Sequence, residues 1–179
     1  FSAFGIGALD TVEEPEEPDS TKWKEDWDRV HIQADIDVGA AGLQHSYVID
    51  RNTLVSTTLA MSANGTKNDV HRLDDQLVLQ RDELIDSRTG RYTLATSLTR
   101  KLGGGASVVS GIVLHHLRYD QTFGAFDDTA RAADGALGRY VLAVDEDGAA
   151  DLYQAYTQAR LSLARVLELN AGVHVQRFS

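Results

Sequence analysis

Carboxylate side chains form the densest clusters in the sequence of groups that could bind a metal ion. The segment DEDGAAD places Asp145, Asp147 and Asp151 around Gly148, and carboxylate oxygens are ligands that calcium accepts. The segment lacks the ligand spacing and the terminal Glu of an EF-hand loop. We therefore expect a solvated turn in an outer loop, with the three aspartates kept as the candidates for a metal site.

A second acidic run, VEEPEEPDS, surrounds Pro15 and Pro18. Its carboxylates belong to Glu13, Glu14, Glu16, Glu17 and Asp19. Runs of this kind are usually exposed loops. We expect an exposed connection here, and a role in binding a cation or a partner is the alternative.

The chain shows no pattern typical of catalysis. His115 and His116 are adjacent in a predicted strand, so their side chains point to opposite faces, and the other histidines are scattered. No G-x-S-x-G, H-E-x-x-H or paired-carboxylate motif is present. The glycines 103–105 are not followed by Lys-Ser/Thr or a helix start, so they predict a hairpin turn. We expect no enzyme activity and no cofactor.

The composition of the chain limits the classes of binding partner that we expect. The net charge is -10 and the chain has no cysteine, which argues against nucleic acid and anionic lipid headgroups and excludes disulfides and thiolate metal sites. No apolar run approaches the ~20 residues that a membrane-spanning helix needs. The chain opens with Phe1 and shows no signal-peptide pattern, so we expect it to be internal to a longer chain.

Alternation of apolar and polar residues with period two dominates the sequence and predicts β-strands. The C-terminal segments DLYQAYTQARLSLA and LELNAGVHVQRFS form one predicted hairpin, with its break at Arg165 and Val166. RYTLATSLTRK, LVSTTLAMSAN and HIQADIDV show the same pattern, the second after a turn at 50–52. After HIQADIDV the parity slips through Gly39–Gly42, which predicts a β-bulge.

The alternating segments together predict about seven long strands, arranged as an all-β antiparallel meander. We expect short turns to alternate with long polar connections at 10–30, 64–90 and 120–150. Outer-membrane barrels combine short periplasmic turns with long outer loops, and their strands need ~9 to 11 residues to cross the bilayer. Bacterial barrels have an even strand count. The odd count therefore indicates a partial barrel domain over 1–179, with edge strands that need further pairing.

Four segments of the sequence resemble barrel strands of the large TonB-dependent receptors of Bacteroidetes-type bacteria. They are DGAADLYQAYTQARLSLARVLELNAGVHVQRFS, DSTKWKEDWDRVHIQ, STTLAMSANG and RYTLATSLTRKL. The resemblance implies an outer-membrane location in a Gram-negative bacterium and energy-coupled nutrient import. It implies a 22-stranded barrel with an N-terminal plug domain that contacts TonB, both outside this chain. The implied partners are the rest of the barrel, the plug and outer-membrane lipid. A surface lipoprotein is a further candidate.

Polar residues of the last two predicted strands share one face and could line the barrel lumen. These lumen-facing candidates are Gln154, Gln158, Arg160, Asn170, His174 and Gln176. They would contact plug, solvent or ligand. Two other functions stay open: a passive outer-membrane channel or small structural barrel, and a soluble β-sandwich binding module.

Overall fold

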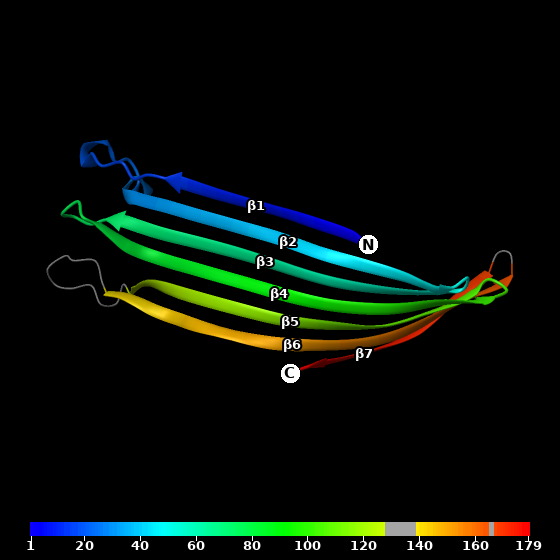
Figure 1. The fold of residues 1–179 in the computed structure, drawn as a ribbon. Coiled ribbons are helices and arrows are strands. Elements are labelled where there is room, and N and C mark those ends of the chain that lie inside the picture. Colours follow the sequence, from blue (N-terminus) through cyan, green and yellow to red (C-terminus); the bar gives the residue numbers. More distant parts are fainter. Residues whose placement is uncertain (128–138, 165–166) are drawn as a thin grey trace.

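The computed structural model describes residues 1–127, 139–164 and 167–179. Its strands form one antiparallel sheet in sequence order, β1 to β7 (Figure 1). The strands are β1 Ser2–Glu14, β2 Val30–Asp50, β3 Thr53–Leu73, β4 Leu79–Gly103, β5 Ala106–Asp127, β6 Arg139–Ala164 and β7 Leu167–Phe178, with short 3-10 helices η1 Ser20–Lys22 and η2 Asp26–Arg29. The expected antiparallel meander of about seven long strands is confirmed.

The sheet is a single layer without a hydrophobic core of its own. Its accessible surface is 12670 Å², whereas a folded globular chain of 19.5 kDa exposes about 8,500 Å². Among the described residues the only buried large apolar side chain is that of Leu73, 5% exposed. The apolar faces of the strands are therefore open, and no second sheet covers them within the described residues.

Two of the three predicted long connections are mostly strand, whereas the first, expected at 10–30, is a connection from 15 to 29 between β1 and β2. β3 runs to Leu73 and β4 starts at Leu79, so the connection expected at 64–90 is reduced to 74–78. The segment 120–150 is largely β5 and β6, with 128–138 outside the described residues. The sequence misleads here because a strand with water on its outer face carries polar residues and resembles a loop. Asp145, Asp147 and Asp151 accordingly lie in β6 and not in the predicted turn.

The predicted turns at 50–52 and 103–105 join β2 to β3 and β4 to β5. At the first turn, the Asp50 carboxylate accepts a hydrogen bond from the Asn52 amide at 2.7 Å. At the second, Gly103, Gly104 and Gly105 have φ values of 85°, 58° and 80°, a region that glycine enters without steric cost. The predicted break at Arg165 and Val166 lies outside the described residues.

The expected bulge at Gly39–Gly42 is wrong. Pairing runs without a shift through this segment on both sides of β2, from Phe4↔Gly42 to Gly7↔Gly39 and from Gly39↔Ala63 to Gly42↔Ala60. The parity slips because the apolar residues change faces along an uninterrupted strand. Ile36 and Val38 lie on one face near the loop end, and Leu43 lies on the other face nearer the turn.

Three aromatic rings lie across glycines of neighbouring strands. Phe4, Tyr119 and Tyr156 are each paired directly with a glycine, respectively Gly42, Gly148 and Gly111. A Cβ atom built on Gly111 would lie 2.7 Å from the Tyr156 ring and 2.8 Å from the Thr96 carbonyl oxygen. Gly111 therefore supplies the space that the ring occupies, an arrangement known to support glycines in sheets.

Replacing Gly111 with valine should displace the Tyr156 ring and cost about 1 to 3 kcal/mol of unfolding free energy, as overpacking does. Gly90→Val is the matched control, because a Cβ atom at Gly90 meets nothing within 4 Å. The readout is the midpoint of urea-induced unfolding. Equal midpoints for the two variants would contradict the packing described here.

Candidate functional site

One face of the sheet carries an apolar band that crosses most of the strands. Residues paired directly across strands project from the same face, so the register defines rows of side chains. One row of four leucines ends at Tyr153: Leu43↔Leu59↔Leu94↔Leu114↔Tyr153. Neighbouring rows add Ile112, Val175, Leu98 and Val173. We call this side of the sheet the band face.

The band extends about 26 Å along β6, from Leu161 to Tyr153. At the ~40° tilt of barrel strands this length corresponds to about 20 Å in height, somewhat less than the ~25 Å apolar band of outer-membrane barrels. Its side chains are open to the surroundings, with Leu59 55% and Val173 65% exposed. Nearer the loop end the same face becomes polar, in the row Asp35↔Lys67↔Asp86↔Thr122↔Asp145.

The opposite face is polar at the level of the band. It carries Gln44, whose amide donates to Ser56 Oγ at 2.9 Å, and Thr93, which bonds His115 Nδ1 at 2.9 Å. These residues were not among the predicted site residues, because choosing them needs the register of β2 to β5. Beyond the band, this face becomes apolar at Ile32, Ile85 and Phe123.

The six lumen-facing candidates come together on the opposite face. Gln154 pairs with Gln176, and Arg160 pairs with Asn170. His174 pairs with Tyr156, and Gln158 pairs with Gly172. That this face lines a lumen stays a prediction.

Glu168 connects two of these six side chains by hydrogen bonds. It accepts hydrogen bonds from Arg160 at 2.5 Å and from Asn170 at 3.1 Å. Within the described part of the chain, the side chains of Gln154, Gln158, Gln176 and His174 have no such bond. Among the described residues, four of the six candidates therefore have hydrogen-bonding capacity that no side chain of the sheet uses.

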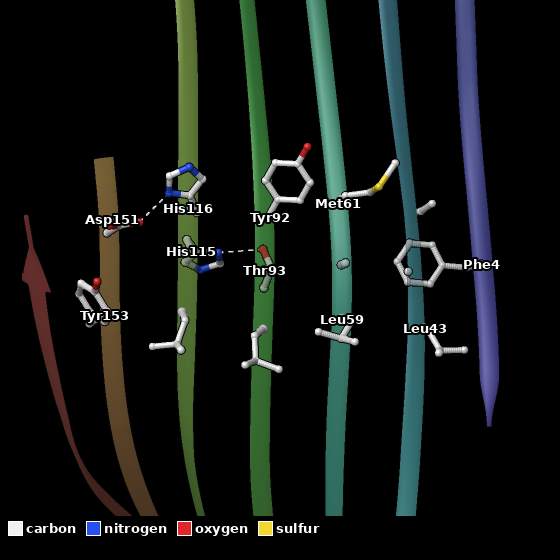
Figure 2. Close-up of a pocket in the computed structure, with 15 residues that line it drawn as sticks. Phe4, Leu43, Leu59, Met61, Tyr92, Thr93, His115, His116, Asp151 and Tyr153 are labelled. Atoms are coloured by element: carbon white, nitrogen blue, oxygen red, sulfur yellow. Dashed lines mark hydrogen bonds and ion pairs between the residues drawn. The ribbon is translucent and has the colours of Figure 1, made fainter. Parts of the chain in front are cut away.

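The band face is hollowed into an open groove of about 660 Å³ (Figure 2). Two complete rows line it, the leucine row that ends at Tyr153 and the row Ala41↔Met61↔Tyr92↔His116↔Asp151. Residues of the intervening row, Phe4↔Gly42↔Ala60↔Thr93↔His115, contribute to the lining as well. The lining is mainly aliphatic and aromatic carbon, with a pair of polar side chains at one end. At that end His116 Nδ1 lies 2.8 Å from the Asp151 carboxylate. An apolar groove of this kind suits a hydrocarbon chain.

The metal candidates do not form a site. Asp151 bonds His116, and Asp145 accepts from Thr122 Oγ1 at 3.4 Å. Asp147 lies opposite Asp120. In residues 1–127, 139–164 and 167–179, no group of three or more His, Asp or Glu side chains is arranged to hold a metal ion. The calcium alternative therefore receives no support from the geometry.

Ion pairs at the loop end fasten the connections to the sheet. Arg81 makes a bidentate pair with the nearly buried Asp69, at 2.9 and 2.8 Å. Arg29 donates twice to the Leu73 carbonyl, at 3.1 and 2.7 Å, and lies 5.0 Å from the Trp23 ring centre. This network holds the 15–29 connection against the end of β3.

The acidic run is only partly a loop. Glu13 and Glu14 belong to β1, and the Glu16 carboxylate lies 2.9 Å from His31 Nδ1. Glu17 accepts at its backbone carbonyl a 2.6 Å hydrogen bond from the Trp23 indole. The carboxylates of Glu13 and Glu16 contact His31 and that of Glu17 contacts Lys22, so these three leave less charge for an external partner.

Comparisons with known proteins identify no relative: no family model, no curated protein and no solved structure matches the chain. No helix in the described part of the chain is long and apolar enough to cross a membrane.

The stability of the turn at 74–78 should depend on pH through the carboxylate of Asp74. The Asp74 carboxylate accepts from the amides of Val78 and Gln76, each at 2.9 Å, and these bonds, led by Val78, lower the pKa of Asp74. A lowered folded pKa contributes stability above the ordinary carboxyl pKa of about 3.9, and this stability is lost as the pH falls through the folded value.

At neutral pH, Asp74→Ala should reduce the hydrogen-exchange protection of the Gln76 and Val78 amides roughly tenfold, because it removes their acceptor. The neighbouring Asp75→Ala is the control, since Asp75 is 80% exposed and contacts Arg29 instead. Unchanged protection in the Asp74 variant would show that the carboxylate does not hold the turn.

Proposed function

We propose that this chain is a wall segment of an outer-membrane β-barrel, in a nutrient importer of the TonB-dependent class. The observation that carries the membrane assignment is the apolar band on one face, opposite a polar face at the same height. Barrel walls in the outer membrane have this pattern because lipid contacts one side and the lumen the other.

The single layer supports a bilayer as the covering of the band. A soluble sandwich buries its apolar residues between two packed sheets, yet the described residues form one sheet. Hydrocarbon needs no second sheet, because lipid tails solvate Leu, Val and Ile side chains directly. The large exposed surface is then an expected property of a wall segment.

The free edges indicate that the segment pairs with more sheet. Among the residues that the structure describes, β1 pairs only with β2, and β7 only with β6. Unpaired backbone groups cannot remain in a hydrocarbon layer. The partner that fits both edges is further barrel wall, which the resemblance to 22-stranded receptors would supply.

The importer assignment rests on that resemblance and on the free amides of the opposite face. A plug domain packed in the lumen would use hydrogen-bonding groups such as those of Gln154, Gln158 and Gln176. The proposed polypeptide then imports its nutrient only when TonB transmits energy to the plug.

Neighbouring residues of β7 test which face contacts lipid. The native chain has no cysteine, so single-cysteine variants of the full-length protein give clean labelling. In membranes, Gln176→Cys should react with a water-soluble maleimide. Val175→Cys, on the band face, should react at least about tenfold more slowly, because its thiol lies in hydrocarbon. Equal rates at the two positions would refute the membrane assignment.

Uptake tests the importer assignment separately. Nutrient accumulation by cells that express the full-length protein should stop when TonB is deleted. Accumulation that continues without TonB, together with steady conductance in planar bilayers, would replace the importer with a passive channel.

A further inference from the structure

A pocket of about 360 Å³ lies at the loop end of the sheet, where the 15–29 connection joins β1 to β2 (Figure 1). Its apolar walls come from two sources. Pro15 and Trp27 belong to the connection, and Val30 and Ile32 belong to the first turns of the β2 backbone. Trp27 is 66% exposed, so its indole ring offers open area to a ligand. The volume lies within the range of small-ligand pockets.

The connection is held in shape by its own hydrogen bonds. The Glu17 amide donates to the Asp28 carbonyl oxygen at 2.7 Å, and the Trp23 indole donates to the Glu17 carbonyl oxygen at 2.6 Å. Asp28 Oδ2 accepts from the amides of Lys24 and Glu25, at 2.6 and 3.0 Å. These bonds join the two ends of the connection, so the pocket walls are ordered before a ligand arrives. A preformed pocket loses less free energy on binding.

Two carboxylates at this pocket have capacity left for a cation. Glu14 is the last residue of β1 and pairs directly with Ile32. Its side chain has no hydrogen bond or ion pair with a described residue. The amides of Lys24 and Glu25, together with the charge of Lys24, lower the pKa of Asp28, which therefore stays ionised at neutral pH. Asp28 Oδ1 accepts no hydrogen bond from a described residue.

The basic residues nearby are engaged with other acids or outnumbered by them. Arg72 contacts Asp26 and Asp82, at 2.6 and 3.1 Å. Lys22 lies 3.6 Å from Glu17, the third carboxylate at the pocket, and its side chain is 63% exposed. Residues 13–29 carry eight acidic against three basic side chains. The pocket therefore combines an aromatic and aliphatic wall with an excess of negative charge.

We propose that this pocket binds an arginine side chain of an imported peptide. The aliphatic stem of the arginine lies against Val30 and Ile32, and the guanidinium plane stacks on the Trp27 indole. Its N–H groups donate to the Glu14 carboxylate. An acidic side chain would be repelled, and an uncharged one would make no ion pair. The inference rests on the proposed function, because Ile32 then lies on the lumen side at the outer mouth of the barrel.

The test uses the full-length protein, folded in detergent and titrated by isothermal calorimetry with tripeptides whose termini are blocked. The probe is glycyl-arginyl-glycine, and its matched control carries citrulline, an uncharged side chain of nearly the same shape. The arginine peptide should bind about tenfold more tightly, because only its side chain makes the cation–π contact and the charge-assisted hydrogen bonds.

Glu14→Gln and Trp27→Leu should each remove most of this preference. Glu13→Gln is the control variant, because it removes the same charge from the adjacent position, which lies on the band face, and it should preserve the preference. If the Trp27 variant does not fold, the Glu14 variant decides, since Glu14 is exposed.

Equal affinity for the two peptides would overturn the inference, and so would an equal loss in the Glu13 and Glu14 variants. Heat-modifiable gel mobility of the same samples reports whether the barrel is folded. A folded barrel without a preference for the arginine peptide overturns only the pocket assignment. A full-length protein that neither folds in detergent nor inserts in membranes overturns the proposed function as well.

Discussion

The backbone register between neighbouring strands is the constraint on which the other features depend. Period-two alternation places successive side chains on opposite faces, and six antiparallel pairings then fix which residues share a row. A shift of one residue in any pairing would move a whole strand's apolar side chains to the other face. The leucine row, the groove and the polar rows behind them all follow from that register.

The apolar residues change from one face of the sheet to the other along the strands, and this change explains which surface is polar at each level. Near the turns, Leu59 and Leu94 lie on the band face, whereas Ile32 and Ile85 lie on the opposite face near the loops. A strand that leaves the bilayer meets water on its outer side, so its outward residues become polar. Its inward residues can then pack against connections such as the 15–29 segment, which places Trp27 beside Ile32. The same exchange produced the parity slip that sequence reasoning interpreted as a bulge.

The sequence predicts which segments form strands and which residues lie on the same face, because both depend on the local alternation of apolar and polar residues. Gln154 and Gln176 were placed on one face from period two alone. The connections at 64–90 and 120–150 were predicted wrongly, because polar residues on both sides of a strand, as in 64–73, resemble a loop, whereas the connection predicted at 10–30 is present at 15–29. The contacts of the site needed the register between strands: Glu168 of β7 with Arg160 of β6, and His116 of β5 with Asp151 of β6. No local signal in the sequence indicates those pairs.

A nitroxide scan along β6 of the full-length protein in lipid bilayers measures whether a membrane covers the band face. Single labels from 147 to 161 would be compared for accessibility to oxygen, which concentrates in hydrocarbon, and to a water-soluble nickel chelate. A bilayer-spanning wall predicts oxygen maxima at Tyr153, Ala155, Thr157, Ala159 and Leu161, chelate maxima at the residues between them, and loss of the oxygen maxima beyond Asp151. Uniform chelate accessibility at all of these positions would contradict a membrane location for this sheet.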